Sequence, residues 1–290
     1  LLLVSYLYSR KESEEDFLIA GRDRKWIQLM LSKYAGTVGA GWFVAYTAFA
    51  YEFGLGILSV LLGLFVGYVW FALWGAPRIK VAVGLSKAYT QGDFVFAATN
   101  SHLARQVTNG LAALTNVLWL LVAIVGGAKL IEYLGLFSYE IALLLTILVV
   151  FSYLLVGGFK AVIVTDVIQS MILLGLLLVV GYGLLSEVDV LKLLTTAENN
   201  LGFAATLAFV LLGALGPFSS PDRYQLTYAG KDADEIKKGF GYSYLPVISS
   251  AIVLLLIGLY MWSVNPALDP GTVFSEALKF HLPEQMLFLG

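Results

Sequence analysis

The sequence has 290 residues, of which 59% are hydrophobic and 13% are charged, and its net charge is −2. A soluble domain carries roughly a quarter charged residues, so this chain lacks the charges to cover a water-facing surface, and we expect lipid around most of it. The absence of cysteine excludes disulfides and thiolate metal sites. With two histidines, His102 and His281, we expect no zinc or haem centre. The net charge gives no information on nucleic-acid binding, and we expect no nucleic-acid partner.

Seven segments meet or approach the roughly 20 apolar residues that a helix needs to cross the hydrocarbon core. In chain order they are Ile27–Ala50, Phe53–Ala76, Val107–Ile131, Tyr139–Val156, Ala161–Leu185, Leu201–Phe218 and Gly241–Val264. Each must satisfy its own backbone hydrogen bonds in lipid, so helices are expected. The sequence therefore predicts an all-α fold, a polytopic transmembrane helical bundle that forms a single domain over residues 1–290.

The two ends of the sequence carry shorter apolar runs. Leu1–Tyr8 reads as the end of a further helix, and Gln285–Gly290 as the beginning of another. We therefore expect the sequence to be a fragment of a longer protein.

The basic residues are distributed unevenly between the two sides of the predicted bundle. Most of them lie in four loops, those before the first full span and after the second, fourth and sixth spans. In an alternating topology these four loops lie on one side, which the positive-inside rule assigns to the cytoplasm. Two of these loops are long, Pro77–Gln106 and Ser219–Phe240. We expect a surface helix in the first and a solvated stretch in the second.

The first full span departs from a plain apolar helix near its middle, where Gly36, Gly39 and Gly41 lie close together. Small residues let membrane helices approach each other, so this stretch suits helix packing. Glycine also lowers helix stability by about 1 kcal/mol per residue. The same cluster therefore suits a helix that breaks and frees carbonyls for a cation and amides for a solute. The residues alone leave both interpretations open.

The sixth span carries a second point of interruption, at Gly216 and Pro217. Proline has no N–H group and clashes with the carbonyl four residues earlier. Interrupted spans at matching positions of two halves indicate a transporter binding site, and spans one and six match if the fold consists of two five-helix halves. The alternative is that the sixth span simply ends at Pro217.

Two ionisable residues within the predicted spans are candidates for a functional role. Asp166 follows Thr165 near the cytoplasmic end of the fifth span, where a carboxylate is either functional or solvated at the interface. Lys33 lies about two turns into the first span, close enough for its side chain to reach the cytoplasmic interface, which we favour. The alternative is that Lys33 pairs with Asp166 or takes the place of a bound cation.

Six stretches resemble, in the same order, parts of the sodium/solute symporter family, which includes the sodium/proline and sodium/glucose transporters. They are Glu15–Arg22, Ser32–Gly39, Tyr51–Gly54, Gly157–Gln169, Pro221–Gln225 and Ala229–Asp232. The clearest is Gly157–Gln169, which is similar to the family's Gly-Gly, Ala-Val, Thr-Asp, Gln signature at the fifth core helix. Pro221–Gln225 resembles the cytoplasmic loop after the sixth core helix.

The resemblance implies a LeuT-type inverted-repeat fold in which the second repeat is incomplete. Residues 1–8 would end an extra N-terminal helix, residues 27–185 would form the first five-helix repeat, and residues 201–290 would begin the second. It also implies cotransport driven by a sodium gradient, with no enzymatic activity and no catalytic residue.

The family's sodium site uses main-chain carbonyls of the first core helix. The motif match assigns these carbonyls to Ala35 and Val38. It also aligns Asp166 with an acidic residue of the family that supports sodium binding or release. Thr37 stands where many members have Asp or Asn, and Gly39 stands where serine is common. The family's remaining sodium ligands are hydroxyls of the eighth core helix, which would begin where this sequence ends.

The residues beside the two interruptions are the candidates for contact with a solute. They are Gly39, Gly41, Trp42, Pro217, Phe218 and Ser219. The resemblance implies a small organic solute such as proline or another amino acid, sodium as the coupling ion, and no other cofactor. Besides that solute, the lipid bilayer is the expected partner, and no protein partner is indicated. The short loops and the lack of cysteine favour a multi-pass protein of a prokaryotic cell membrane.

Three other functions remain open from the residues. The first is a transporter-like membrane sensor joined to a signalling domain, and the second is a sodium-independent or proton-coupled carrier in which Lys33 replaces the cation. The third, a membrane-embedded enzyme, is the least favoured, because the predicted spans hold no cluster of acid, base and nucleophile.

Overall fold

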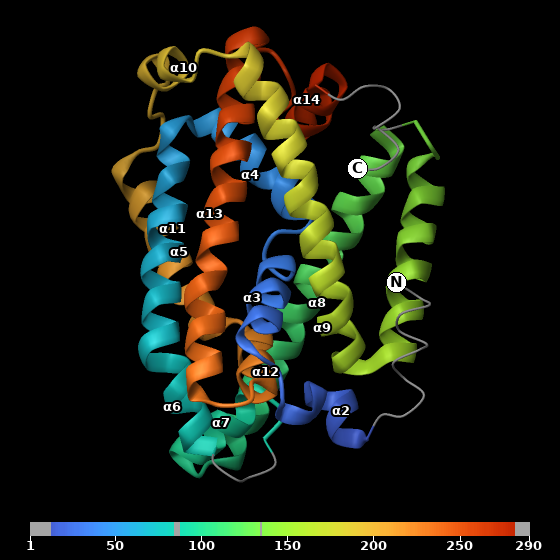
Figure 1. Cartoon of the computed structure of the whole chain (residues 1–290), viewed down its shortest axis with the longest axis vertical. Coiled ribbons are helices and arrows are strands. Elements are labelled where there is room, and N and C mark those ends of the chain that lie inside the picture. Colours follow the sequence, from blue (N-terminus) through green and yellow to red (C-terminus); the bar gives the residue numbers. More distant parts are fainter. Residues whose placement is uncertain (1–12, 84–87, 134, 282–290) are drawn as a thin grey trace.

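The computed structural model describes residues 13–83, 88–133 and 135–281, and these residues form an elongated bundle of helices (Figure 1). The predicted runs Leu1–Tyr8 and Gln285–Gly290 lie outside the described residues. The helices are α2 (Glu14–Ile19), α3 (Trp26–Ala35), α4 (Ala40–Phe53), α5 (Leu58–Trp70), α6 (Ala76–Val83), α7 (Gln91–Thr99), α8 (His102–Tyr133), α9 (Tyr139–Glu187), α10 (Val190–Thr196), α11 (Phe203–Ser219), α12 (Pro221–Ala229), α13 (Ala233–Val264) and α14 (Val273–His281). Two isolated bridges are the only β-type pairings in this part of the chain.

Four of the described helices are long and apolar enough to cross a membrane, and a bent pair adds a fifth span. They are Leu55–Ala82, His102–Tyr133, Gly158–Gly183, Ala233–Val264, and the pair Phe203–Ser219 with Pro221–Ala229. The other two predicted spans are present as shorter pieces. The first is divided into α3 and α4, of 10 and 14 residues, and the fourth is the apolar helix Tyr139–Ser152.

The bundle has two distinct ends (Figure 1). The helices α2, α6 and α7 lie at one end, and α10 and α14 lie at the other. The basic loops meet at the α2 end, where the amide of Arg24 donates to the carbonyl of Ala229 at 3.0 Å. Lys160 reaches the same end, with its Nζ 3.1 Å from Asp16 Oδ1. The predicted clustering of the basic loops is therefore confirmed, and their assignment to the cytoplasm stays a prediction.

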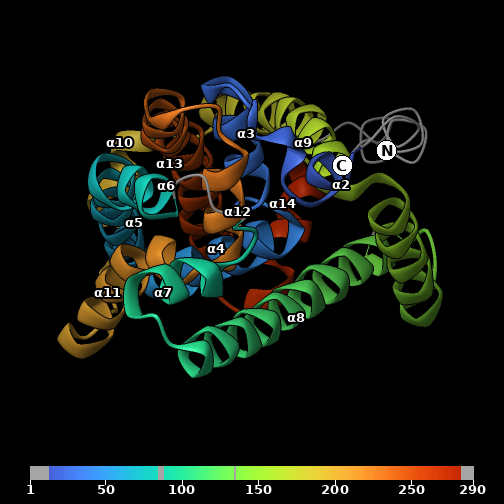
Figure 2. The same cartoon turned by 90° about the horizontal axis from the view of Figure 1, so that it is seen from below.

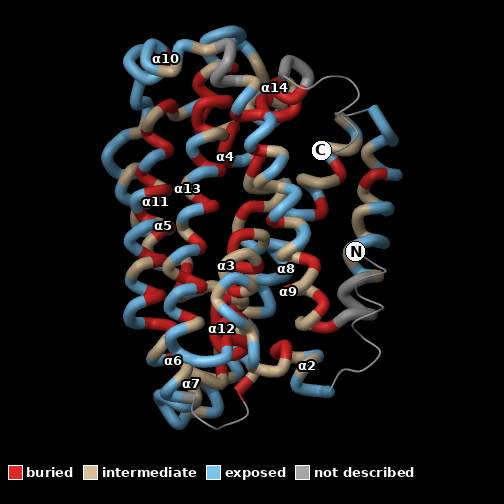
Figure 3. Tube along the Cα trace, in the orientation of Figure 1, coloured by how far each residue is buried: buried red, intermediate tan, exposed pale blue. Residues whose placement is uncertain are grey.

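The core follows the long axis and is formed around α13, which packs on α3, α4 and α5. Figure 3 shows buried segments running through the middle of the bundle, while much of α8 and α9 faces outward. Seen from below, α8 runs obliquely across one face (Figure 2). The outward residues of α8, among them Leu118 and Trp119, are apolar and exposed, as expected for a helix in contact with lipid.

Glycines set the closest helix contact of the bundle, between α5 and α11. A Cβ atom on Gly63 would lie 2.3 Å from the carbonyl oxygen of Val210, and one on Gly213 would lie 2.6 Å from the amide nitrogen of Leu64. Neither position has room for a side chain. The two backbones therefore approach as membrane helices do when small residues line their interface.

The long helix α9 bends at Gly158, whose backbone has φ 55° and ψ −173°. The predicted spans Tyr139–Val156 and Ala161–Leu185 are therefore two arms that meet at this bend. Phe17 of α2 packs into the bend, and Asp16 pairs with Lys160 just after it. Burial alone would raise the pKa of Asp16, but hydrogen bonds from Lys160 and Ser13 outweigh it and hold that pKa below its usual value.

The surface helix predicted between the second and third spans is present as α7. Thr90 caps it, and Asp93 at the third position completes a capping box. Arg105 at the start of α8 pairs with Asp93 at 2.6 Å. Burial alone would raise the pKa of Asp93, but the amides of Tyr89 and Thr90 and the charge of Arg105 lower it below its usual value.

The expectation of a solvated stretch over Ser219–Phe240 is wrong for its first half, although Lys231, Asp232, Asp234, Lys237 and Lys238 in the second half are exposed. Pro221–Ala229 forms the helix α12, most of which is buried, and α13 already begins at Ala233. Only a short turn at Gly230–Asp232 separates them. The apolar side chains Leu226 and Tyr228 lie in the core, and their burial explains why this stretch folds back into the protein instead of entering water.

Candidate functional site

The first interruption is a true break of the helix. The helix α3 ends at Ala35 and α4 begins at Ala40. The amide of Val38 donates to the carbonyl of Tyr34, and the amides of Trp42 and Phe43 both donate to that of Gly39. Within the described part of the chain, no hydrogen bond to the carbonyls of Ala35 or Val38 is found. These are oxygen ligands without a formal charge, as a hard cation prefers.

The acidic residue Asp166 lies beside the end of α3. Ser32 donates from its Oγ to Asp166 Oδ2, which places the carboxylate one turn before Ala35. One turn further along α9, the Oγ of Ser170 donates to the carbonyl of Leu31 at 2.7 Å. These two contacts fasten α9 along α3 next to the break, and they supply hydroxyl and carboxylate oxygens near the free carbonyls.

Lys33 does not reach the interface, so the expectation that its side chain extends into water is wrong. The residue is 0% exposed, because α13 and α9 pack on α3 and Tyr68 of α5 covers the ammonium group. Its Nζ donates to Thr37 Oγ1 and lies 4.5 Å from the centroid of the Tyr68 ring. Lys33 also does not pair with Asp166, whose carboxylate is bonded to Ser32 on a different side of α3.

The sixth span is interrupted as well, but the break lies at Ser220. The helix α11 continues through Pro217 to Ser219, so the span does not end at Pro217. Ser220 is extended, with φ −84° and ψ 117°, and Pro221 begins α12 at an angle of 46° to α11. Proline suits this place because the first amides of a helix have no intrahelical partner.

The two breaks meet through the first turn of α12. The Nη2 of Arg223 donates to Thr37 Oγ1 at 3.3 Å and to the Tyr68 hydroxyl at 3.5 Å. Asp222 pairs with Arg223, and its Oδ2 lies 3.8 Å from the place of a Cβ on Gly36. A polar cluster of Lys33, Thr37, Tyr68, Asp222 and Arg223, called here the break cluster, therefore joins the two interrupted spans.

Sequence reasoning missed three members of the break cluster, Tyr68, Asp222 and Arg223, as site residues. Arg223 was expected in a solvated loop, yet it is only 7% exposed. One local signal was available: Ser220, Pro221 and Asp222 give a cap residue, a proline at the first helical position and an acidic residue in the first turn. That pattern predicts a helix start. No sequence pattern predicts the pairing with Thr37 across 186 positions.

The predicted solute contacts fall into two groups. Gly39, Gly41 and Trp42 form the start of α4, where Gly41 faces Val122 of α8 and the Trp42 ring stacks on Tyr46 at 4.6 Å. On α11, Pro217 is buried and Ser219 is exposed.

The side chain of the third α11 residue, Phe218, does not point toward the start of α4. Its ring packs against Trp70 and Phe71, at 4.9 and 5.3 Å between centroids. A role of either group in solute binding stays a prediction.

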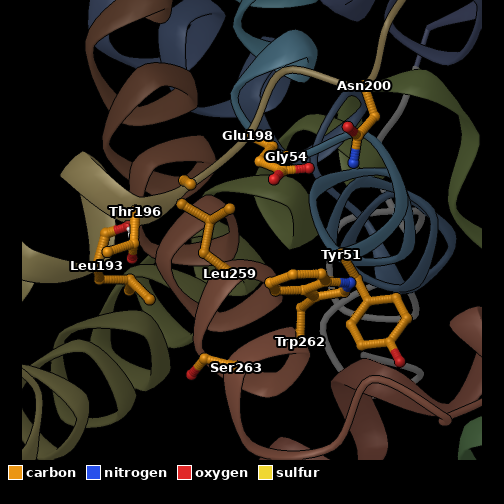
Figure 4. Close-up of a pocket in the computed structure, with 10 residues that line it drawn as sticks. Tyr51, Gly54, Leu193, Thr196, Glu198, Asn200, Leu259, Trp262 and Ser263 are labelled. Atoms are coloured by element: carbon orange, nitrogen blue, oxygen red, sulfur yellow. Dashed lines mark hydrogen bonds between the residues drawn. The ribbon is translucent and has the colours of Figure 1, made fainter.

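A small cavity of about 70 Å³ lies at the opposite end of the molecule, near α10. Figure 4 shows its wall, with Tyr51, Leu259 and Trp262 on one side and Glu198 and Asn200 on the connection to α11. A backbone bridge between Gly54 and Asn199 holds this connection against the end of α4. The cavity is therefore built into the end of the bundle and does not include the break cluster.

The sequence pattern of the family described as "Sodium:solute symporter family" matches residues 17–275 of this chain. The matched range contains both breaks and the whole break cluster. It therefore connects the geometry described above to a family of transporters, not of enzymes.

Two curated relatives illustrate the similarity. The sodium/pantothenate symporter of Haemophilus influenzae is 30% identical over 289 residues, which cover 92% of this chain and 58% of that protein. The sodium/proline symporter of Staphylococcus aureus is 24% identical over 232 residues, covering 76% of this chain and 44% of the relative. The chain thus spans about half the length of the curated relatives that it matches.

The fold has a counterpart among solved structures. A Na⁺-coupled sialic acid symporter, described in a substrate-bound outward-open state, matches with a TM-score of 0.82 and 18% sequence identity. The match covers 99% of this chain and 66% of that one. It confirms the predicted LeuT-type arrangement of an all-helical, multi-pass membrane protein. By its sequence pattern and its fold, this chain belongs to the sodium:solute symporter family.

Proposed function

We propose that the protein is a secondary active transporter that couples inward sodium movement to the uptake of a small organic solute across a bacterial cell membrane. The observation that carries the proposal is the break between α3 and α4, where the carbonyls of Ala35 and Val38 have no hydrogen-bond partner among the described residues and Asp166 lies nearby. The family of the chain and the bacterial origin of its relatives support it.

The donor atoms at the break fit a sodium ion. The carbonyls of Ala35 and Val38 would hold it, and Asp166 would add negative charge nearby, steadied by Ser32. Sodium supplies the driving force for uptake when its gradient is directed inward. Neutral carbonyl ligands suit this role, because they add no formal charge of their own that would stay buried after the ion is released toward the cytoplasm.

The start of α4 is suited to hold the solute. The first amides of a helix lack intrahelical partners, and the helix dipole makes that end partly positive. A polar oxygen of the solute would therefore be held near Gly39 and Gly41. The two breaks allow α3 and α12 to move relative to α4 and α11, which would expose the site to each side in turn.

The solute class follows from the relatives. The names of those described above give pantothenate, proline and sialic acid as solutes. All three carry a carboxylate at neutral pH, so we infer a small organic acid or amino acid, with proline and pantothenate as the first to test.

The proposal is tested with the complete gene product that contains these 290 residues, reconstituted in liposomes. Uptake of labelled proline, pantothenate and other small acids is measured under an inward sodium gradient and under an equal potassium gradient. We expect accumulation of one of these solutes only with sodium. Equal uptake under both gradients would contradict sodium coupling.

A sodium-independent carrier is the second candidate, and the position of Lys33 favours it. Its buried ammonium group lies two residues before the free carbonyl of Ala35, so it would repel a cation bound there. In the same uptake experiment this candidate predicts accumulation without sodium that responds to a proton gradient. The sensor alternative predicts binding of the solute without accumulation.

A further inference from the structure

The break cluster contains more positive than negative charge. Lys33 is 0% exposed and Arg223 is 7% exposed. The one carboxylate in contact with them is that of Asp222, whose side chain is 41% exposed and therefore partly neutralised by solvent. Buried charges in proteins are normally paired. This pair of cations therefore lacks a buried negative partner among the described residues.

The same two side chains carry more hydrogen-bond donors than the cluster has acceptors. An ammonium group has three N–H donors and a guanidinium group has five. Within the described residues, their acceptors are Thr37 Oγ1 and the hydroxyl of Tyr68. Nη1 of Arg223 forms an ion pair with Asp222 but no aligned hydrogen bond, and Nε has no partner in the described part of the chain.

The exposed backbone of the first break lies on the same side as Asp222. Gly36 is exposed although it lies between two interrupted spans, and Asp222 is the side chain closest to it on the α12 side. Three residues further on, a Cβ on Gly39 would meet nothing within 4 Å. A carboxylate that approached from the side of Gly36 would have to displace the 41% exposed carboxylate of Asp222 from Arg223.

We propose that Lys33 and Arg223 form a binding site for the carboxylate group of the transported solute, at the junction of the two breaks. This proposal rests on the proposed function and specifies its substrate class. A carboxylate supplies four lone-pair sites, and the planar guanidinium fork accepts it in a bidentate geometry that an ammonium group cannot offer. Lys33 contributes the second charge, and Thr37 and Tyr68 hold both cations in place.

The test compares each acid with an analogue in which an uncharged group replaces the carboxylate. Binding of proline and prolinamide, and of pantothenate and its alcohol analogue, is measured on the complete purified protein by tryptophan fluorescence, in a sulfate buffer and again in chloride. We expect the acid to bind at least about tenfold more tightly than its neutral analogue, as the loss of charge-assisted hydrogen bonds implies.

Substitutions then identify the residues that produce the preference for the acid over its analogue. R223Q and K33M should each reduce the ratio of acid to neutral affinity by about tenfold, and R223K should retain part of it because the charge remains while the fork is lost. K80M is the matched control. Lys80 is also a half-buried cation at the α2 end, but its Nζ is satisfied by the carbonyls of Tyr228 and Gly230 at 3.1 and 2.7 Å, so the ratio should not change.

Three outcomes would overturn the proposal. The first is equal binding of acids and neutral analogues by the unchanged protein, a result that needs no variant to fold. The second is an unchanged ratio in R223Q and K33M. The third is displacement of every acid by millimolar chloride, which would assign the site to an inorganic anion. Sodium-driven uptake is measured separately, so uptake without acid preference refutes only this site, and acid preference without sodium dependence refutes only the proposed coupling.

Discussion

Lys33 shows how one residue can contradict a sound local rule. A lysine two turns from a helix end usually extends its side chain to the interface, and the sequence offers no reason to expect otherwise. In the fold, however, α13 and α9 pack on α3, and the ring of Tyr68 on α5 lies 4.5 Å from the ammonium group. Which face of a helix is covered depends on packing between distant segments, so it cannot be read from the local pattern.

Asp166 shows the opposite case. Its position after Thr165 in the family-like stretch predicts a functional carboxylate, and the structure places it against Ser32 beside the break. The sequence could indicate this residue because a carboxylate within an apolar span is itself a strong signal. Its role as a sodium ligand stays a prediction.

The substitution G158A tests the bend in α9 at the level of one residue. The φ of 55° and ψ of −173° belong to a region that is nearly restricted to glycine, and a Cβ would lie 2.5 Å from the Phe17 ring. We expect a loss of about 1–3 kcal/mol from backbone strain, with further loss from the clash, seen as a lower midpoint of thermal unfolding in detergent.

The control for this substitution is G175A on the same helix. A Cβ on Gly175 would meet nothing within 4 Å, so its unfolding midpoint should be unchanged or slightly raised. Equal midpoints for the two variants would show that the bend does not require glycine.

The sequence predicted that both spans are interrupted, but it located only the first interruption at the correct residues. Gly36 and Gly39 flank the first break as the glycine cluster suggests. In the sixth span the interruption was expected at Pro217, yet α11 tolerates that proline and ends at Ser219. Pro217 lies within the last turn, where it removes a single hydrogen bond, and the extended Ser220 with Pro221 then provides a new helix start.

The helix α12 was not predicted, because its composition suggests solvent. Polar and charged side chains dominate its first half, where Asp222, Arg223 and Gln225 lie close together. The structure buries it through Leu226 and Tyr228, and pairs its charges within the break cluster. This charged stretch is part of the candidate site only because the break between α3 and α4 lies opposite it in the fold.

The contact between α5 and α11 yields a matched pair of predictions on one helix. G213A should destabilise the protein by about 1–3 kcal/mol, the usual cost of overpacking, because the new Cβ would lie 2.6 Å from the amide nitrogen of Leu64. G216A should be neutral or stabilising, since nothing lies within 4 Å of that position and alanine favours a helix more than glycine does. The unfolding midpoints of both variants in detergent decide this, and a midpoint for G213A at or above that of G216A would contradict the packing described here.

At the scale of the whole molecule, composition alone predicted a multi-pass helical bundle, and the order of short family-like stretches predicted its fold. The match to a solved symporter at a TM-score of 0.82 confirms both. The division into a first repeat over 27–185 and the beginning of a second from 201 stays a prediction. The break cluster could not be foreseen, because its members come from α3, α5 and α12 and meet only in the folded chain.

The central claim is that the break between α3 and α4, with Asp166, forms a sodium site. Equilibrium binding of radioactive sodium to the complete purified protein tests it without knowledge of the solute. We predict saturable binding that excess sodium displaces and potassium does not, with an affinity about tenfold lower in D166N. In the control S249A, which removes an exposed hydroxyl bonded to Leu245 within α13, the affinity should be nearly unchanged. Absence of saturable sodium binding, or equal affinity in D166N and the unchanged protein, would contradict the account.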